Sequence, residues 1–118
     1  MSRSKRLIIL GEPASKANSR RIVRMHGRLF SIKSRKALAY VKEFKRQCKP
    51  MRRMLQGDLS AEIDVWYASR RPDLDASLIF DCMQGLIYAN DRQIKEQHLR
   101  WHLDPLNPRA EILVKEIS

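Results

Sequence analysis

The chain has 118 residues, which suits a single domain over residues 1–118 and leaves no room for two hydrophobic cores. Hydrophobic residues make up 43% of the chain, which excludes a disordered protein and places the charge on a folded surface. The 24 Lys and Arg against 13 Asp and Glu give a formal net charge of +11. This charge favours nucleic acid over acidic lipid, because no long amphipathic basic helix is apparent.

The first expected element is a short buried strand, Leu7 to Leu10, closed by a glycine and a proline. This apolar run is too short for a signal-peptide core or a membrane span, so we expect a cytoplasmic protein without membrane association. The polar loop that follows, residues 11–21, carries Lys16, Arg20 and Arg21. These side chains are either contacts to DNA phosphates or ordinary solvated loop residues.

A hairpin and a helix are expected next. Residues 22–24 and 29–31 flank His26-Gly27, a pair that suits a tight turn. Ser34 is the expected N-cap of an amphipathic helix of about four turns that ends by Pro50. Its apolar positions repeat at intervals of three and four residues, namely Ala37, Leu38, Val41, Phe44 and Cys48. The basic outer face is a solvated surface unless it lies beside a DNA-binding site.

The strongest predicted strand is residues 59–67, where apolar and polar side chains alternate. From Asp75 the pattern turns helical, with Asp75 as the expected N-cap and Gly85 as the expected C-terminal cap glycine. Residues 94–103 and 110–117 are two further strand candidates, joined by a loop with two prolines. The elements predict an α/β (α+β) fold with a mixed, largely antiparallel sheet and two main helices.

The two cysteines and the two tryptophans are assigned to packing. Cys48 and Cys82 lie on the apolar sides of the predicted helices, so we expect buried, reduced thiols. Trp66 and Trp101 fall in strand candidates, which favours core or dimer packing over base stacking.

Other chemistries lack support in the sequence. His98 and His102 are four residues apart, a spacing at which two histidines of a helix can bind one zinc ion. In a strand they would be about 13 Å apart, too far to share an ion. The chain has no glycine-rich phosphate loop and no Gly-x-Ser-x-Gly motif. We therefore expect neither a nucleotide cofactor nor serine hydrolase chemistry.

Three aspartates beside arginines form the candidate site: Asp73, Asp75 and Asp91. In an extended segment Asp73 and Asp75 would face the same way, about 6 to 7 Å apart. With Asp91 they are sufficient for a magnesium ion, which needs one or two carboxylates plus water and phosphate oxygens. Such an ion lowers the pKa of a bound water and offsets charge on a scissile phosphate. The alternative is structural, with Asp75 as an N-cap, Asp73 as a turn former and Asp91 as a loop residue.

The site motifs also resemble those of a known family. The segment Arg70-Arg71-Pro72-Asp73-Leu74-Asp75, a helix with Asp81, and then Gly85-Leu86-Ile87-Tyr88-Ala89-Asn90-Asp91-Arg92-Gln93-Ile94 are similar to the signature of RusA-type Holliday-junction resolvases. The order of elements agrees over most of the chain. The resemblance implies a small endodeoxyribonuclease, often phage- or prophage-encoded, that binds four-way DNA junctions as a homodimer. It also implies paired nicks made with magnesium or manganese, in DNA recombination and repair.

The resemblance places the catalytic and metal-binding roles on Asp73, Asp75 and Asp91. The chain departs from the family pattern at four points. Asn90 stands where an acid is common, Ala76 where asparagine is usual and Ile79 where a lysine is usual. The interval to Asp91 is also shorter than in familiar members by nearly a helical turn. If the lysine helps to stabilise the phosphate or position water, another base must replace it, or activity is weaker.

The expected DNA-binding residues lie around the aspartates and in the N-terminal loop: Lys16, Arg20, Arg21, Arg70, Arg71, Arg92 and Lys95. The sequence thus predicts a magnesium-dependent junction endonuclease in the cytoplasm of a bacterial or phage-infected cell. Two alternatives stay open. One is a basic, non-catalytic nucleic-acid-binding protein with structural aspartates, and the other is a nuclease for other branched DNA.

Overall fold

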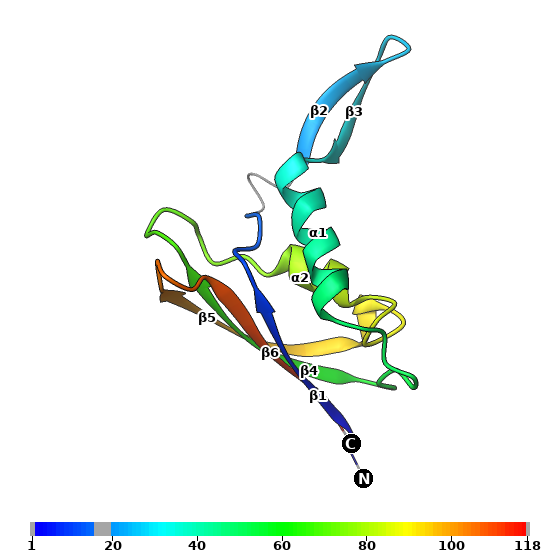
Figure 1. Ribbon diagram of the computed structural model, residues 1–118. Helices are drawn as coiled ribbons and strands as arrows, with labels where there is room; N and C mark the ends of the chain where they lie inside the picture. Colours follow the sequence, from blue (N-terminus) through cyan, green and yellow to red (C-terminus); the bar gives the residue numbers. More distant parts are fainter. Residues whose placement is uncertain (1, 16–19, 118) are drawn as a thin grey trace.

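The computed structural model describes residues 2–15 and 20–117. Its main element is a four-stranded sheet in the order β1-β6-β4-β5, with a separate two-stranded hairpin, β2-β3, at the opposite end from the termini (Figure 1). The elements in chain order are β1 (Ser4–Leu10), β2 (Arg20–Met25), β3 (Arg28–Lys33), α1 (Arg35–Gln47), β4 (Leu59–Tyr67), α2 (Ser77–Met83), the 3₁₀ helix η2 (Asp91–Gln93), β5 (Ile94–Leu103) and β6 (Arg109–Glu116).

The sheet is mixed, as predicted. Strand β6 runs antiparallel to both β1 and β4, and only β4 and β5 are parallel. Because β4 pairs on both edges, it is a central strand, and its residues alternate between buried and half-buried along its whole length. The alternation buries one face of the sheet, and α1 and α2 cover that face (Figure 1).

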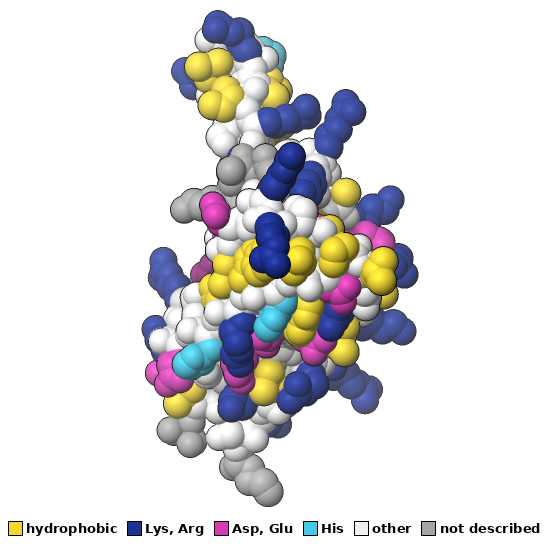
Figure 2. Space-filling view, turned by 90° about the vertical axis from the view of Figure 1, so that its left-hand side faces the viewer, with side chains coloured by type: hydrophobic (Ala, Val, Ile, Leu, Met, Phe, Trp, Pro, Cys, Tyr) yellow, Lys and Arg dark blue, Asp and Glu magenta, His cyan; other side chains and the backbone are white. Residues whose placement is uncertain are grey.

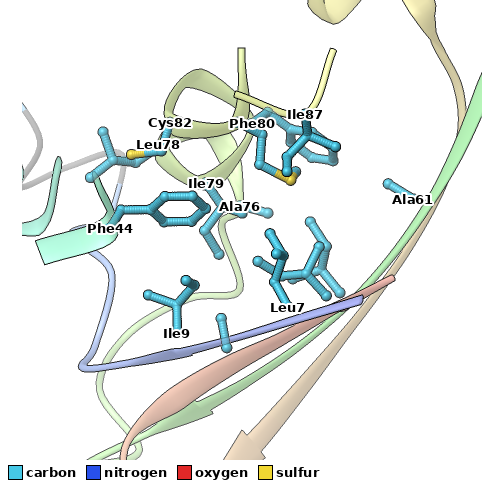
Figure 3. Close-up of a cluster of buried hydrophobic side chains, with 14 of the residues drawn as sticks. Leu7, Ile9, Phe44, Ala61, Ala76, Leu78, Ile79, Phe80, Cys82 and Ile87 are labelled. Carbon is cyan, nitrogen blue, oxygen red and sulfur yellow. The ribbon is translucent and has the colours of Figure 1, made fainter. Parts of the chain in front are cut away.

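The hydrophobic core fills the space between the helices and the sheet (Figure 3). Strand β1 contributes Leu7 and Ile9, while α2 contributes Ile79 and Cys82. Both cysteines are free and buried, which confirms the prediction of reduced thiols. Burial, assisted by the charge of Asp81, raises the pKa of the Cys82 thiol to about 12, so this thiol stays protonated at neutral pH.

Helix α1 begins where the sequence predicts. The Ser34 hydroxyl accepts a hydrogen bond from the Ala37 amide at 3.1 Å, as expected of an N-cap. The predicted apolar face was wrong at Leu38, which is 53% exposed, whereas Tyr40 is buried with Phe44. A step of one residue turns a helix by about 100°, so Leu38 is carried off the stripe that faces the sheet.

Helix α2 begins at Ser77, one residue later than predicted, with Ala76 and not Asp75 in the N-cap position. The cause is packing, because Ala76 is buried in the core and its backbone is not helical. The Asp75 carboxylate, one residue before the N-cap position, still accepts a hydrogen bond from the Ser77 amide, the first amide of the helix. The prediction for the other end is confirmed, since Gly85 follows the C-cap residue with a φ of 87°.

No helix among the described residues is long and apolar enough to cross a membrane.

The Glu116 carboxylate connects both ends of the chain to the segment before β4. It accepts hydrogen bonds from the Arg3 amide at 3.0 Å and the Gln56 amide at 2.8 Å, and it lies 3.8 Å from the Arg3 guanidinium. These amide bonds, followed by the charge of Arg3, hold the pKa of Glu116 below its usual value. The ionised carboxylate is therefore the form that stabilises the fold.

We expect Glu116→Gln to lower the melting temperature at pH 7, and the difference from wild type to shrink as the pH falls. A depressed folded-state pKa gives stability that is present above the unfolded-state pKa of about 4.3 and is lost as the pH falls through the folded value. Thermal melts from pH 7 to pH 3 measure this. The control is Glu96→Gln, since exposed Glu96 only approaches His98 at 4.0 Å. A Glu116→Gln difference that is constant over this range would contradict the account.

Candidate active site

The loop between β4 and α2, residues 68–76, is held in place by two aromatic side chains. The Tyr67 hydroxyl accepts a hydrogen bond from the Asp75 amide at 3.2 Å, and the Trp101 indole donates one to the Pro72 carbonyl at 2.9 Å. The rings of Tyr67 and Trp101 stack with centroids 5.6 Å apart. The ends of two neighbouring parallel strands therefore position the loop that carries Asp73 and Asp75.

A further carboxylate, Glu12, lies at the start of this loop. It follows β1 and accepts a hydrogen bond from the Ala68 amide at 3.1 Å. The pKa of the Tyr67 hydroxyl is raised mainly by burial, and then by the negative charges of Asp75, Glu12 and Asp73. The charges of all three carboxylates thus act on the Tyr67 hydroxyl, and Glu12 joins the two aspartates that the sequence analysis selected.

The two oxygens of Asp75 have different environments. Oδ1 accepts hydrogen bonds from the Ser77 amide at 3.0 Å and the Ser77 hydroxyl at 2.6 Å. Oδ2 is buried and has no hydrogen-bond partner in the part of the chain that the structure describes. A buried carboxylate oxygen without a donor is costly unless a cation or a water molecule satisfies it. Asp75 therefore fits the role of a divalent-ion ligand: Oδ2 is available to the ion, and the hydrogen bonds from Ser77 to Oδ1 fix the carboxylate.

Asp91 is presented by a short, well-capped turn. In η2 the Asn90 side chain accepts from the Arg92 amide at 2.9 Å, and the Gln93 side chain accepts from the Asn90 amide at 3.0 Å. This reciprocal capping box gives Asn90 a structural role at the position where the family commonly has an acid. The Asp91 amide donates to the Gln84 side chain at 2.9 Å, and Asp91 itself is exposed.

Asp91 opens onto a small hollow beside α2. Its volume is about 230 Å³, and it is lined by Ser77, Phe80, Asp81, Asp91, Ile94 and Gln97. Burial first, and then the charges of Asp91 and Asp81, raise the pKa of the nearby Tyr88 hydroxyl, which donates to the Phe80 carbonyl at 2.7 Å. Ser77 lines this hollow and also bonds Asp75, so it lies between the two groups of carboxylates.

The structure thus gathers the acids in two neighbouring groups. Asp73, Asp75 and Glu12 all act electrostatically on Tyr67, while Asp91 shares its hollow with Asp81. Within residues 2–15 and 20–117, no three His, Cys, Asp or Glu are arranged closely enough to hold a metal ion. The assignment of one metal site to Asp73, Asp75 and Asp91 therefore stays a prediction, and it requires these side chains to converge.

The predicted DNA-binding residues near these acids are on the surface. The exposed side chains are Arg70, Arg71, Arg92 and Lys95. Arg20 and Arg21 were expected in a loop, but they lie in β2, where Arg20 donates to the Ser31 hydroxyl at 2.9 Å. Lys16 lies outside the described residues. Exposed basic side chains therefore flank both groups of carboxylates.

His98, His102 and Trp66 lie on the other face of the four-stranded sheet, among charged side chains. His102 stacks on Trp66 with ring centroids 4.4 Å apart and bonds Asp64 at 2.8 Å, and the Arg109 guanidinium covers the Trp66 ring at 4.0 Å. His98 instead approaches Glu96. Trp66 is thus half-buried beneath polar neighbours, whereas Trp101 helps to position the site loop.

Two functional contacts were not found by sequence reasoning. Glu12 is an acid in a basic loop, a signal that could have marked it. The bond from Trp101 to Pro72 and the reach of Glu12 to Ala68 span 29 and 56 residues, so no local pattern reveals them. Such contacts depend on which strands become neighbours in the sheet.

A family comparison agrees with this arrangement. The family model described as Endodeoxyribonuclease RusA matches residues 11–115, nearly the whole chain. No curated protein shows significant similarity to the chain.

Ile79, at the position where the family usually has a lysine, provides a test of the core. It is fully buried on the core-facing side of α2, so we expect Ile79→Lys to reduce the free energy of unfolding, by on the order of 4 kcal/mol. Urea denaturation measures this. The volume-conserving Ile79→Met should cost less than about 1.5 kcal/mol. An Ile79→Lys protein as stable as wild type would show that this position can reach solvent.

Proposed function

Because the chain belongs to the RusA family of endodeoxyribonucleases, we propose that it is a divalent-metal-dependent nuclease that resolves Holliday junctions by paired nicks. The observation that carries the metal dependence is the Asp75 Oδ2 atom, which is buried and has no hydrogen-bond partner among the described residues. Neighbouring carboxylates on a chain of net charge +11 are explained if they bind a cation while DNA phosphates contact the surrounding basic side chains.

Magnesium, or manganese in its place, would activate a water molecule and offset the charge on the scissile phosphate. The residues that would hold the ion are Asp73, Asp75 and Asp91. Ser77 fixes the Oδ1 atom of Asp75, so Oδ2 would be the oxygen that binds the ion. Tyr67 keeps the Asp75 backbone in place through its amide. The chain thus contributes a preorganised carboxylate and not a flexible one.

A basic residue that takes the role of the family lysine must come from outside α2, because the residue at that position is the buried Ile79. Arg70 and Arg71 belong to the same loop as Asp73, and Arg92 and Lys95 follow Asp91 in sequence. All four are exposed, which suits contacts to the DNA backbone on both sides of the carboxylates. We propose that Arg71 or Arg92 supplies the positive charge at the cleaved phosphate.

A homodimer completes the proposal. A four-way junction presents two symmetry-related strands for nicking, and a two-fold dimer places two identical sites against them. The role that follows is DNA recombination and repair in the cytoplasm of a bacterial or phage-infected cell. A protein that binds DNA without cutting, or that prefers other branched DNA, is distinguished by the substrate tests below.

We expect wild type to nick a synthetic four-way junction in magnesium, and Asp75→Asn to lose at least about 100-fold in cleavage rate while still binding it. Asparagine can accept the same two bonds from Ser77, so the fold is kept while the charge at Oδ2 is lost. Single-turnover cleavage and gel-shift binding measure the two effects, with flaps and duplex as alternative substrates.

The control is Asp58→Asn, since Asp58 is exposed in the segment before β4. It should cut at the wild-type rate. Full cleavage by Asp75→Asn would refute the metal site, and a wild type that binds junctions without cutting would favour a non-catalytic DNA-binding protein.

Glu12→Gln tests whether the additional carboxylate belongs to the site. Glutamine can still accept from the Ala68 amide, so only the charge changes. We expect the magnesium concentration for half-maximal cleavage to rise several-fold, because one negative charge near Asp73 and Asp75 is removed. A magnesium titration of the cleavage rate measures this, and an unchanged midpoint would exclude Glu12 from the site.

A further inference from the structure

No hydrophobic layer formed by residues 2–15 or 34–117 covers the β2-β3 hairpin. It forms its own two-stranded sheet, and none of the residues from Arg20 to Lys33 is buried. Figure 1 shows it projecting from the N-terminal end of α1, away from the four-stranded sheet and the termini. An isolated two-stranded ribbon is marginally stable in water, so a hairpin of this kind is completed by what it binds.

Large apolar side chains on the hairpin face solvent. The exposed fractions are 70% for Ile22, 66% for Leu29, 50% for Met25 and 41% for Phe30. The strand register places Val23 opposite Phe30, and Met25 opposite Arg28, on one face. Figure 2 shows apolar and basic side chains together over the projecting part of the molecule. The hairpin therefore combines exposed apolar surface with positive charge.

The charge identifies the kind of partner. Residues 20–33 contain five basic side chains, Arg20, Arg21, Arg24, Arg28 and Lys33, and no acidic one, which gives a net charge of +5. Two copies of such a ribbon would repel each other, whereas DNA attracts it through its phosphates. A partner that also accepts apolar side chains must offer exposed base faces, as DNA does where stacking is interrupted.

The shape of the hairpin suits entry into DNA. The six-residue strands are about 20 Å long, and a two-stranded ribbon fits the major groove of about 12 Å width. The turn is preformed, because His26 and Gly27 have φ values of 51° and 76°. The Arg20 guanidinium bonds both the hydroxyl and the carbonyl of Ser31, which ties the two strands together at their base.

We propose that the β2-β3 hairpin inserts into branched DNA, with its arginines on the phosphates and the face that carries Val23, Met25 and Phe30 against bases unstacked at the branch point. The inference deepens the proposed function and rests on it for the choice of branched DNA. The hairpin is then the element that distinguishes a junction from an uninterrupted duplex, because only the junction offers unstacked bases.

The test uses the full chain and a four-way junction with 2-aminopurine at the branch point, in EDTA so that nothing is cut. Wild type should bind with a rise in fluorescence as the base unstacks. Phe30→Ala should bind the junction about 5- to 150-fold more weakly, lose the fluorescence rise and bind duplex as before. Phe30→Trp keeps an aromatic face and should restore both signals.

Matched variants separate the arginines from the apolar face. Arg24→Gln should weaken junction and duplex binding together and reduce the salt dependence by about 0.9 in the log-log slope. Leu106→Ala, at a 97% exposed residue in the β5-β6 loop, and Lys115→Gln, at the opposite end of the molecule, should leave binding unchanged. Thermal melts of Phe30→Ala should match wild type, because Phe30 lies outside the core.

The inference is overturned if Phe30→Ala keeps the wild-type junction affinity and fluorescence, or loses junction and duplex affinity equally. It is also overturned if sedimentation shows that Phe30→Ala dissociates a wild-type dimer, since the hairpin would then bind a second copy. A different result would contradict the nuclease proposal. A wild type that never cuts junctions in magnesium but shows the Phe30-dependent fluorescence would contradict that proposal and still support the hairpin's role.

Discussion

The hydrogen bond from the Asp75 amide to the Tyr67 hydroxyl joins the central strand of the sheet to the candidate active site. Tyr67 is the last residue of β4 and is fully buried, so the position of its hydroxyl is fixed by the core. Trp101 holds the same loop from the neighbouring strand through Pro72. Because these anchors belong to the hydrophobic core, the position of Asp75 depends on the packing of the sheet and not on the loop itself.

A second constraint is electrostatic. Glu12, Asp73 and Asp75 lie near one tyrosine hydroxyl, although like charges in a partly buried site repel. A divalent cation removes this repulsion and supplies the missing partner of Asp75 Oδ2. The surrounding bases are exposed and therefore available to phosphates. The same arrangement thus accounts for carboxylates in a strongly basic protein and for the proposed nuclease chemistry.

The sequence predicts much of this fold because its local signals agree. Alternation identifies β4, the His26-Gly27 pair identifies the hairpin, and Ser34 identifies the start of α1. The errors arise where tertiary packing overrides such signals. Ala76 is drawn into the core, so α2 begins after it, and Leu38 lies just beyond the stripe that faces the sheet.

The candidate site is predictable only in part. Asp73, Asp75 and Asp91 stand out by composition and by their resemblance to a family motif. Glu12 stands out only as an acid in a basic loop, and its contact with Ala68 exists only once β1 and β4 enter one sheet. The different environments of the two Asp75 oxygens also follow from folding, since one faces Ser77 and the other faces the interior.

The most direct test of the metal site is an anomalous difference map from crystals of the wild-type protein soaked in manganese. The account predicts a peak within coordination distance of Asp75 Oδ2, shared with Asp73 and approached by Asp91, and no such peak in Asp75→Asn crystals. An empty map at Asp75, or a peak that persists in Asp75→Asn, would contradict it.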